Sequence, residues 1–266
     1  MKRLLIILVC SSLFYTACVT NAITGRSQLS LVSESDLQTM AFAQYKEFLN
    51  TNKVMPIASN DAEMVKRVGS RIASAVNKYY ADKGVANPAA NYSWEFNLVD
   101  NKEVNAWCMP GGKVVVYTGI LPVTRTEASL AVVLGHEITH ALFGHGKERM
   151  SQQMAAEGLG ALGGVALSGN AKAANIFNNV YGVTAEYGAL LPNSRKQELE
   201  ADHYGLIFAA AAGYNPQEAV DFWTRMAALS ANSSKPPAFL SDHPSDADRI
   251  TKIREVMPEA LKYYKK

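Results

Sequence analysis

Apolar residues recur at helical spacing over several long stretches of the chain. Between residues 60 and 80 they occupy about every third or fourth position, which predicts a helix with one buried face. Ser33, with Asp36 three residues later, has the pattern of a helix N-cap and predicts a second helix that reaches about Asn50. The apolar positions of the first stretch are Met64, Val65, Val68, Ile72, Val76 and Tyr79.

Two further stretches are richer in apolar residues and predict helices buried in the interior. The first opens at Thr126 with "EASLAVVLGHEITHALFGH", whose first half is almost wholly apolar, and Gly144 suits its end. The second runs from about Ser194 to Ala212, where Gly213 stops it. Because such helices cannot remain exposed to water, we expect both to lie in the core.

The remaining pattern predicts two strands and two shorter helices. Residues 94–100 alternate between apolar and polar, and residues 113–118 form a β-branched run after the turn at 110–112. The helices are expected at 216–230 and after Ser245, which begins a capping pattern. The chain is therefore predicted to be mainly helical, with a small sheet.

Length and charge narrow the class of protein. A chain of 266 residues suits one sizeable domain or two small ones. The 26 basic residues nearly balance the 24 acidic residues, so the net charge is only +2. This balance implies no polyanionic partner, and we expect no nucleic-acid binding.

The N-terminus has the pattern of a bacterial export signal. Two basic residues precede an apolar run from Leu4 that is too short to span a bilayer comfortably. Thr16-Ala17-Cys18 resembles a lipobox, in which Cys18 is lipidated and the signal is cut before it. A plain signal peptide or an anchor helix is the alternative. The predicted division is a signal peptide at 1–17, a lipidated tether at 18–32 and one domain at 33–266.

The stretch "LGHEITHALFGHGKER" contains two histidines with the spacing of metal ligands. His136 and His140 are four residues apart, so on a helix their rings project from one face and can share one zinc ion. Glu137 points about 100° further round, beside the open side of the metal, where it can deprotonate the attacking water. The alternative is a histidine pair hydrogen-bonded in the core. A charged Glu137 in an apolar helix argues against this, because an unpaired buried carboxylate is costly.

A zinc site with two histidines and a water needs a third protein ligand from elsewhere. His145 is nine residues from His136, on the opposite side of a continuous helix, and we expect it to be a cap or surface residue. The segment "NSRKQELEADHYGLIF" offers Glu198 and Asp202 on one helix face, with Glu200 off that face. Glu198 can bind zinc while Asp202 accepts the spare N–H of a ligand histidine. A solvated acidic first turn is the alternative.

These motifs resemble those of the gluzincin metallopeptidases related to HtpX and the CAAX prenyl endoprotease. The H-E-x-x-H of 136–140 and "SRKQELEAD" carry the resemblance, and "NAWCMPGGKVVVYTGIL" and "DHPSDADRI" extend it. The opening "CVTNAITGRSQLSLV" resembles the exported lipoprotein branch of that family. The resemblance implies an α+β, mainly helical, zincin-like domain over 33–266, with a small antiparallel sheet beside the H-E-x-x-H helix. It also implies one Zn²⁺ per chain, with Glu198 as the third ligand and Glu200 not a ligand.

The family pattern also places a histidine and an arginine near the zinc, at His243 and Arg249 of this chain. There the two side chains could stabilise the oxyanion of the tetrahedral intermediate, or His243 could occupy the open coordination position. From the sequence alone, a His-Pro pair in a loop is usually only a turn.

A substrate-binding strand is predicted in "GGKVVVYTG". If this is an edge strand beside the zinc helix, Gly112, Val114, Val115 and Val116 can pair with an extended peptide. Main-chain pairing gives affinity with little demand on the peptide sequence. An interior strand fits the same run nearly as well.

The sequence thus predicts an exported zinc endopeptidase, anchored by lipid to the outer membrane and facing the periplasm. Its expected partners are unfolded or misfolded exported polypeptides, with outer-membrane assembly machinery as a candidate. The first alternative is a periplasmic chaperone or assembly factor with a latent zinc site, in which His243 blocks the open position. A purely structural zinc protein fits less well, because it would have a fourth closed ligand and no need of Glu137.

Overall fold

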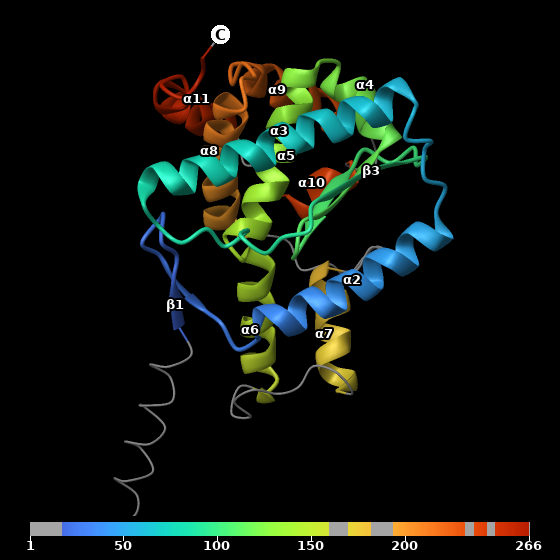
Figure 1. Ribbon diagram of the computed structural model, residues 1–266, viewed down its shortest axis with the longest axis vertical. Helices are drawn as coiled ribbons and strands as arrows, with labels where there is room; N and C mark the ends of the chain where they lie inside the picture. The colour runs from blue at the N-terminus through green and yellow to red at the C-terminus, as the bar shows by residue number, and fades with distance from the viewer. Residues whose placement is uncertain (1–17, 160–169, 182–193, 232–236, 244–247, 266) are drawn as a thin grey trace, which may run out of the picture.

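The computed structural model describes residues 18–159, 170–181, 194–231, 237–243 and 248–265 (Figure 1). The strands are β1 (Cys18–Thr20), β2 (Ser27–Leu29), β3 (Glu95–Val99), β4 (Ala106–Met109) and β5 (Lys113–Tyr117). The helices are α2 (Glu34–Thr51), α3 (Asn60–Lys83), α4 (Leu121–Thr124), α5 (Glu127–Leu142), α6 (His145–Ala156), α7 (Ala171–Tyr181), α8 (Arg195–Ala211), α9 (Glu218–Ala231), α10 (Ala238–Asp242) and α11 (Arg249–Ala260), with a 3-10 turn, η1 (Thr118–Ile120). The mainly helical fold class is confirmed.

The predicted helices begin where their capping residues place them. The side chains of Ser33, Thr126 and Ser194 each accept a hydrogen bond from the backbone N–H three residues later. Ser194 and Gln197 complete a reciprocal capping box at the start of α8. Ser245, predicted to cap the last helix, lies outside the described residues.

Helices α5 and α8 pack against each other in the centre of the molecule, with α3, α9 and α11 around them (Figure 1). Two glycines let their backbones come into contact. A Cβ atom on Gly135 would lie 2.5 Å from the carbonyl oxygen of Gly205, and one on Gly205 would lie 2.7 Å from the backbone nitrogen of His136. Since no larger residue fits at either position, this glycine pair sets how closely the side chains of the two helices approach.

The sheet has three strands in the order β3-β5-β4. Strand β5 is antiparallel to β4, as the resemblance implied, but parallel to β3, so the sheet is mixed. Strand β5 has a neighbour on each side, and all five of its residues are buried. The prediction that Gly112, Val114, Val115 and Val116 form a substrate-pairing edge strand is therefore wrong. A continuous apolar run is typical of a strand buried on both faces, as β5 is.

Each face of the sheet contacts a different hydrophobic core. Val114 and Val116 of β5 belong to the larger core, which also contains apolar residues of α3, α5, α8, α9 and α11. Val115 and Tyr117 face the smaller core with α2, α6 and α7, which lie on the lower side of Figure 1. The sheet thus separates the two cores, and α5 crosses the upper one.

The segment predicted as a tether is bound to the domain. Strands β1 and β2 form an antiparallel hairpin. After the turn, Gln28 donates a hydrogen bond to the Phe143 carbonyl at 2.8 Å, and the backbone N–H of Leu31 donates to Ser151 Oγ at 3.0 Å. The hairpin therefore packs where α5 ends and α6 begins.

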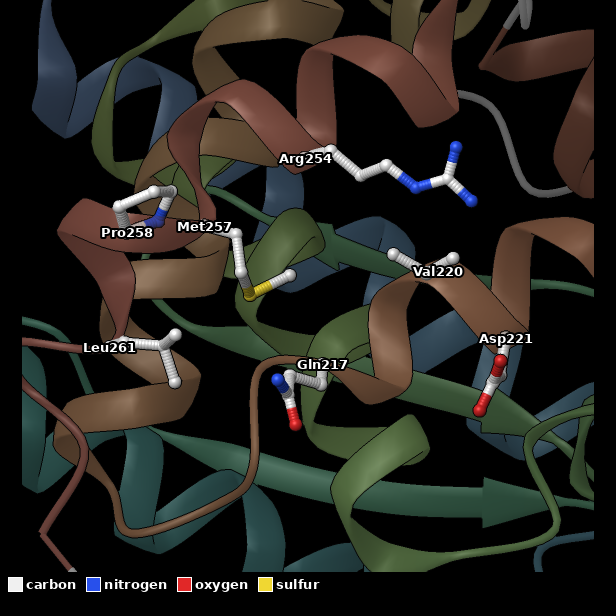
Figure 2. A pocket seen from close by; sticks show the side chains of 7 residues that line it. All are labelled: Gln217, Val220, Asp221, Arg254, Met257, Pro258 and Leu261. Atoms are coloured by element: carbon white, nitrogen blue, oxygen red, sulfur yellow. The ribbon is translucent and has the colours of Figure 1, made fainter.

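Among the described residues, none of the helices combines the length and apolar character needed to cross a bilayer. A groove lies between α9 and α11, and none of the described residues that line it is a histidine (Figure 2). Its lining residues are Gln217, Val220, Asp221, Arg254, Met257, Pro258 and Leu261.

Candidate metal centre

Four side chains from three parts of the chain converge at one buried point. Helix α5 supplies His136 and His140, α8 supplies Glu198, and His243 follows α10. One ligand atom of each residue lies within 4.8 Å of the corresponding atoms of the others. The three side chains that the sequence predicts as zinc ligands are therefore brought together, with His243 as a fourth.

The distances show nitrogen and oxygen atoms facing one another. His136 Nε2 lies 3.0 Å from His140 Nε2 and 3.1 Å from His243 Nδ1. Glu198 Oε1 lies 3.3 Å from His140 Nε2 and 3.1 Å from His243 Nδ1. The His140 ring is neutral, since burial lowers its pKa well below the ordinary value.

The Glu198 carboxyl is charged in this setting. Burial opposes the charged form, but His243 and His136 outweigh it, so its pKa lies well below the ordinary value. Its Oε2 atom is buried and accepts no well-oriented hydrogen bond, although Arg249 Nη2 is 3.1 Å away. A buried carboxylate with an open oxygen, beside inward-facing imidazole nitrogens, is the donor set that zinc prefers.

Asp202 and Arg249 lie on the Nδ1 side of His136, whose Nε2 atom faces the cluster. Asp202 Oδ1 lies 2.9 Å from His136 Nδ1, so it can accept the ring N–H and leave Nε2 free to bind a metal. Arg249 donates Nε and Nη2 to the two oxygens of Asp202, both at 2.8 Å, and stacks 3.4 Å over the Trp223 ring. Its Nη1 lies 3.4 Å from the His243 carbonyl oxygen. Each guanidinium nitrogen thus has a partner and Arg249 positions Asp202, while its predicted role at a substrate oxyanion stays a prediction.

Glu137 lies beside the cluster and outside it. Its side chain is buried, and burial raises the pKa of the carboxyl to about 7. Oε1 lies 3.2 Å from His243 Nε2 but accepts no well-oriented hydrogen bond. A carboxylate with such a pKa and an open oxygen next to a metal can take up and release a proton near neutral pH.

His145 is not part of the cluster, as predicted, but the prediction that it is a cap or surface residue is wrong. Its side chain is fully buried, and its Nδ1 atom lies 2.8 Å from His140 Nδ1. The prediction assumed a continuous helix, but Phe143 ends α5 and Gly144 takes a left-handed conformation with φ 63°. Helix α6 therefore starts in a new direction, which brings His145 back behind His140. A glycine directly before the histidine was the signal in the sequence that could have suggested this.

Glu200 lies outside the metal cluster, which agrees with the expectation that it is not a ligand. The sequence did not predict its partner, which is His145: Glu200 accepts a hydrogen bond from His145 Nε2 at 3.0 Å. Burial opposes its charged form, but the His145 hydrogen bond and the Arg26 guanidinium outweigh it and lower the pKa of the carboxyl.

The fold and the cluster define a zinc metallopeptidase. The residues fit the ion, because the donors are buried nitrogen and oxygen atoms and a candidate base lies beside them. Comparison with known proteins leads to the same class. The model of peptidase family M48 matches residues 61–257, and the chain belongs to this family.

Relatives of two kinds are similar to this chain. The mitochondrial metalloendopeptidase OMA1 of Schizosaccharomyces pombe is 32% identical over 90% of this chain and 66% of its own length. The human OMA1 metalloendopeptidase is 28% identical over 94% of this chain and 48% of its own. A β-barrel assembly-enhancing protease of Yersinia pestis is 30% identical over 60% of this chain and 34% of its own. The chain thus spans about a third to two thirds of the length of these relatives. Membership of family M48 agrees with the metallopeptidase resemblance seen in the sequence. That the chain belongs to the exported lipoprotein branch stays a prediction.

Proposed function

We propose that this chain is a zinc endopeptidase that hydrolyses unfolded or misassembled exported polypeptides. The observation that carries the proposal is Glu137, buried beside a cluster that can hold zinc and outside its ligand set. A structural zinc site has no use for such a carboxylate. A hydrolytic site requires it as a base.

Each residue of the cluster has a defined task in this proposal. His136, His140 and Glu198 would hold the ion, which when bound supplies a Lewis acid for the scissile carbonyl. Glu137 accepts the proton of the attacking water and passes it to the leaving amine. Its pKa of about 7, raised by burial, suits both transfers.

Strand β4 is the candidate surface for the peptide. It is an outer strand of the sheet, and it packs against α5. Tyr117 donates its backbone N–H to the Asn105 carbonyl at 3.1 Å, and from there the alternation of an antiparallel pair turns the backbone groups of Ala106 and Cys108 away from β5. The Ala106 N–H donates to Asn105 Oδ1 at 2.8 Å, so the groups left for a substrate are the Ala106 carbonyl and the N–H and carbonyl of Cys108. An extended chain can pair with these groups whatever its side chains, which suits unfolded substrates.

The site of action is proposed from the N-terminus and from the relatives. Cys18 is exposed at the start of the hairpin, where a lipid would not disturb the core. The Yersinia pestis relative is named as a protease that enhances β-barrel assembly. We propose on these grounds that the enzyme acts at the outer membrane, facing the periplasm, with the assembly machinery as a candidate partner. Incorporation of a labelled fatty acid by the wild type but not by Cys18→Ser would support the anchor, and equal labelling would rule it out.

A latent site is the second candidate, and the position of His243 favours it. Its Nδ1 atom lies among the ligand atoms, so His243 can complete a four-residue ligand set. In that state, the site would be closed to substrate, and the protein would act as a chaperone or assembly factor. Removal of the His243 imidazole would then release peptidase activity.

Digestion of an unfolded protein distinguishes the two candidates. The wild type, the metal-stripped wild type and His243→Ala are compared at equal concentrations. Cleavage by the zinc-loaded wild type, lost when the metal is removed, supports the endopeptidase. Cleavage by His243→Ala alone supports the latent site. No cleavage by either, with one zinc bound per chain, would contradict both.

A further inference from the structure

Behind His140, on the side away from the cluster, a line of polar side chains leads to the N-terminal hairpin. His145 Nδ1 lies 2.8 Å from His140 Nδ1, and His145 Nε2 lies 3.0 Å from Glu200 Oε2. Arg26 Nε donates to both oxygens of Glu200, at 2.8 and 3.0 Å. Four residues from four separate parts of the chain thus form one hydrogen-bonded line.

The direction of each hydrogen bond in this line follows from the charge of Glu200 at one end. Glu200 is paired with a guanidinium, so it is a carboxylate and can only accept, and His145 Nε2 must donate to it. A neutral His145 then has its lone pair on Nδ1 and accepts the Nδ1–H of His140. The remaining lone pair of His140 is on Nε2, the atom that faces the cluster.

Arg26 is fixed by a second acid as well. Its Nη1 atom donates to Glu148 Oε1 at 2.6 Å, and Glu148 also accepts from Gln197 Nε2 at 2.9 Å. The side chains of Arg26, Glu148 and Glu200 are only 11%, 8% and 13% exposed, so water screens these charges little. The pairs are thus part of the interior and not surface ion pairs of small effect.

The hairpin holds Arg26 in place. The residue stands directly before β2, in the turn that joins the two strands, and its carbonyl oxygen accepts the N–H of Asn21 at 2.9 Å. Its own N–H donates to Thr24 Oγ1 at 3.2 Å. The guanidinium therefore enters the interior only while the hairpin is docked on α6 and α8.

We infer that the β1–β2 hairpin is a working part of the metal centre. Arg26 is a positioning residue that acts through Glu200 and His145 to set the tautomer and orientation of His140. The segment after Cys18 thereby couples its own docking to metal affinity, in place of acting as a passive tether. This inference rests on the proposed zinc site but not on any peptidase activity.

The test measures zinc affinity of the full-length chain by competition with a chelator. Arg26→Gln and Glu200→Gln are each expected to weaken binding by up to about 10-fold, less than the roughly 10–100-fold that follows loss of a partner in direct contact with a ligand histidine. Arg26→Lys keeps the charge and should recover part of the loss. Arg67→Gln is the matched control, because Arg67 pairs with Glu127 on the same helix as the ligands but contacts neither Glu200 nor His145.

Two further readouts separate positioning from mere stability. If the residues act along one line, the double variant Arg26→Gln/Glu200→Gln should bind zinc no more weakly than the weaker-binding single variant. With cobalt in place of zinc, both single variants should shift the visible absorption bands, whereas Arg67→Gln should not. Unchanged affinity and spectra in folded Arg26→Gln would overturn the inference, even if Glu200→Gln did not fold. A wild type that binds no zinc would instead refute the proposed function.

Discussion

The two ligand histidines of α5 are supported in different ways. Behind His136, a single carboxylate, Asp202, comes from the helix that also carries Glu198, and Arg249 holds it. Behind His140, the support passes through a second histidine to Glu200 and ends on Arg26 of the hairpin. We call these two sets of contacts the His136 arm and the His140 arm. The His136 arm is direct, whereas the His140 arm depends on a hairpin that packs on the outside of the domain.

The difference shows how one requirement can be met by short and long connections. Each ligand imidazole needs an acceptor for its Nδ1 proton so that Nε2 faces the metal. Helix α8 provides both carboxylates, because Glu200 and Asp202 are two residues apart and point about 200° apart round the helix. One helix therefore serves both histidines, and among the described residues only the contacts behind His140 lead to the N-terminal hairpin.

Loss of Glu198 should lower zinc affinity most, because this residue is itself a predicted ligand and does not act through a histidine. We expect Glu198→Ala to lower zinc affinity by more than the roughly 10–100-fold that follows loss of a partner behind a ligand. Zinc content after dialysis, measured by atomic emission, checks this. Glu200→Gln should still bind one zinc per chain at saturating metal. The reverse pattern would mean that the third ligand is misassigned.

Substitution of Asp202 breaks the His136 arm. Asp202→Asn removes the charge that holds both His136 and Arg249, so we expect zinc affinity to fall by roughly 10–100-fold. Chelator competition gives the value. Asp202→Glu, which keeps the charge, is the matched control and should retain more affinity. A loss smaller than that of Arg26→Gln would contradict the ranking of the two arms.

A methyl group at Gly205 tests the two arms together. In Gly205→Ala, the new Cβ would lie 2.7 Å from the backbone of His136, so α5 and α8 must separate. We expect about 1–3 kcal/mol of destabilisation and weaker zinc binding, measured by denaturant unfolding and chelator competition. Ala211→Gly, at the exposed end of α8, should lower stability slightly and leave zinc affinity unchanged. Equal zinc affinity in all three proteins would show that the helix contact does not set the site.

A change in β4 should alter substrate binding and leave both sets of contacts behind the ligand histidines intact. Cys108→Pro removes a backbone N–H that points away from β5, which an outer strand can tolerate. Loss of one hydrogen bond of about 0.5–1.5 kcal/mol should raise KM by roughly 2–10-fold, with zinc affinity unchanged. Cys108→Ala keeps the N–H and should behave as the wild type. Equal KM values for the two variants would exclude β4 as the peptide site.

The sequence predicts the helices and the core of the site well, because both depend on local spacing. The four-residue steps from His136 to His140 and from Glu198 to Asp202 place side chains on one helix face whatever the tertiary structure. The central position of β5 in the sheet could not be read from its residues, since strand order depends on long-range pairing. Nor could the His145 line, because it depends on the left-handed turn at Gly144 and on a docked hairpin.

The central claim is that a zinc ion and Glu137 together hydrolyse peptide bonds. The most direct measurement is digestion of an unfolded protein by the zinc-loaded chain beside Glu137→Gln, with bound zinc determined in both. We predict cleavage by the wild type, loss of cleavage by at least about 100-fold in the variant, and one zinc per chain in each. Retained cleavage by Glu137→Gln with zinc bound would contradict the account.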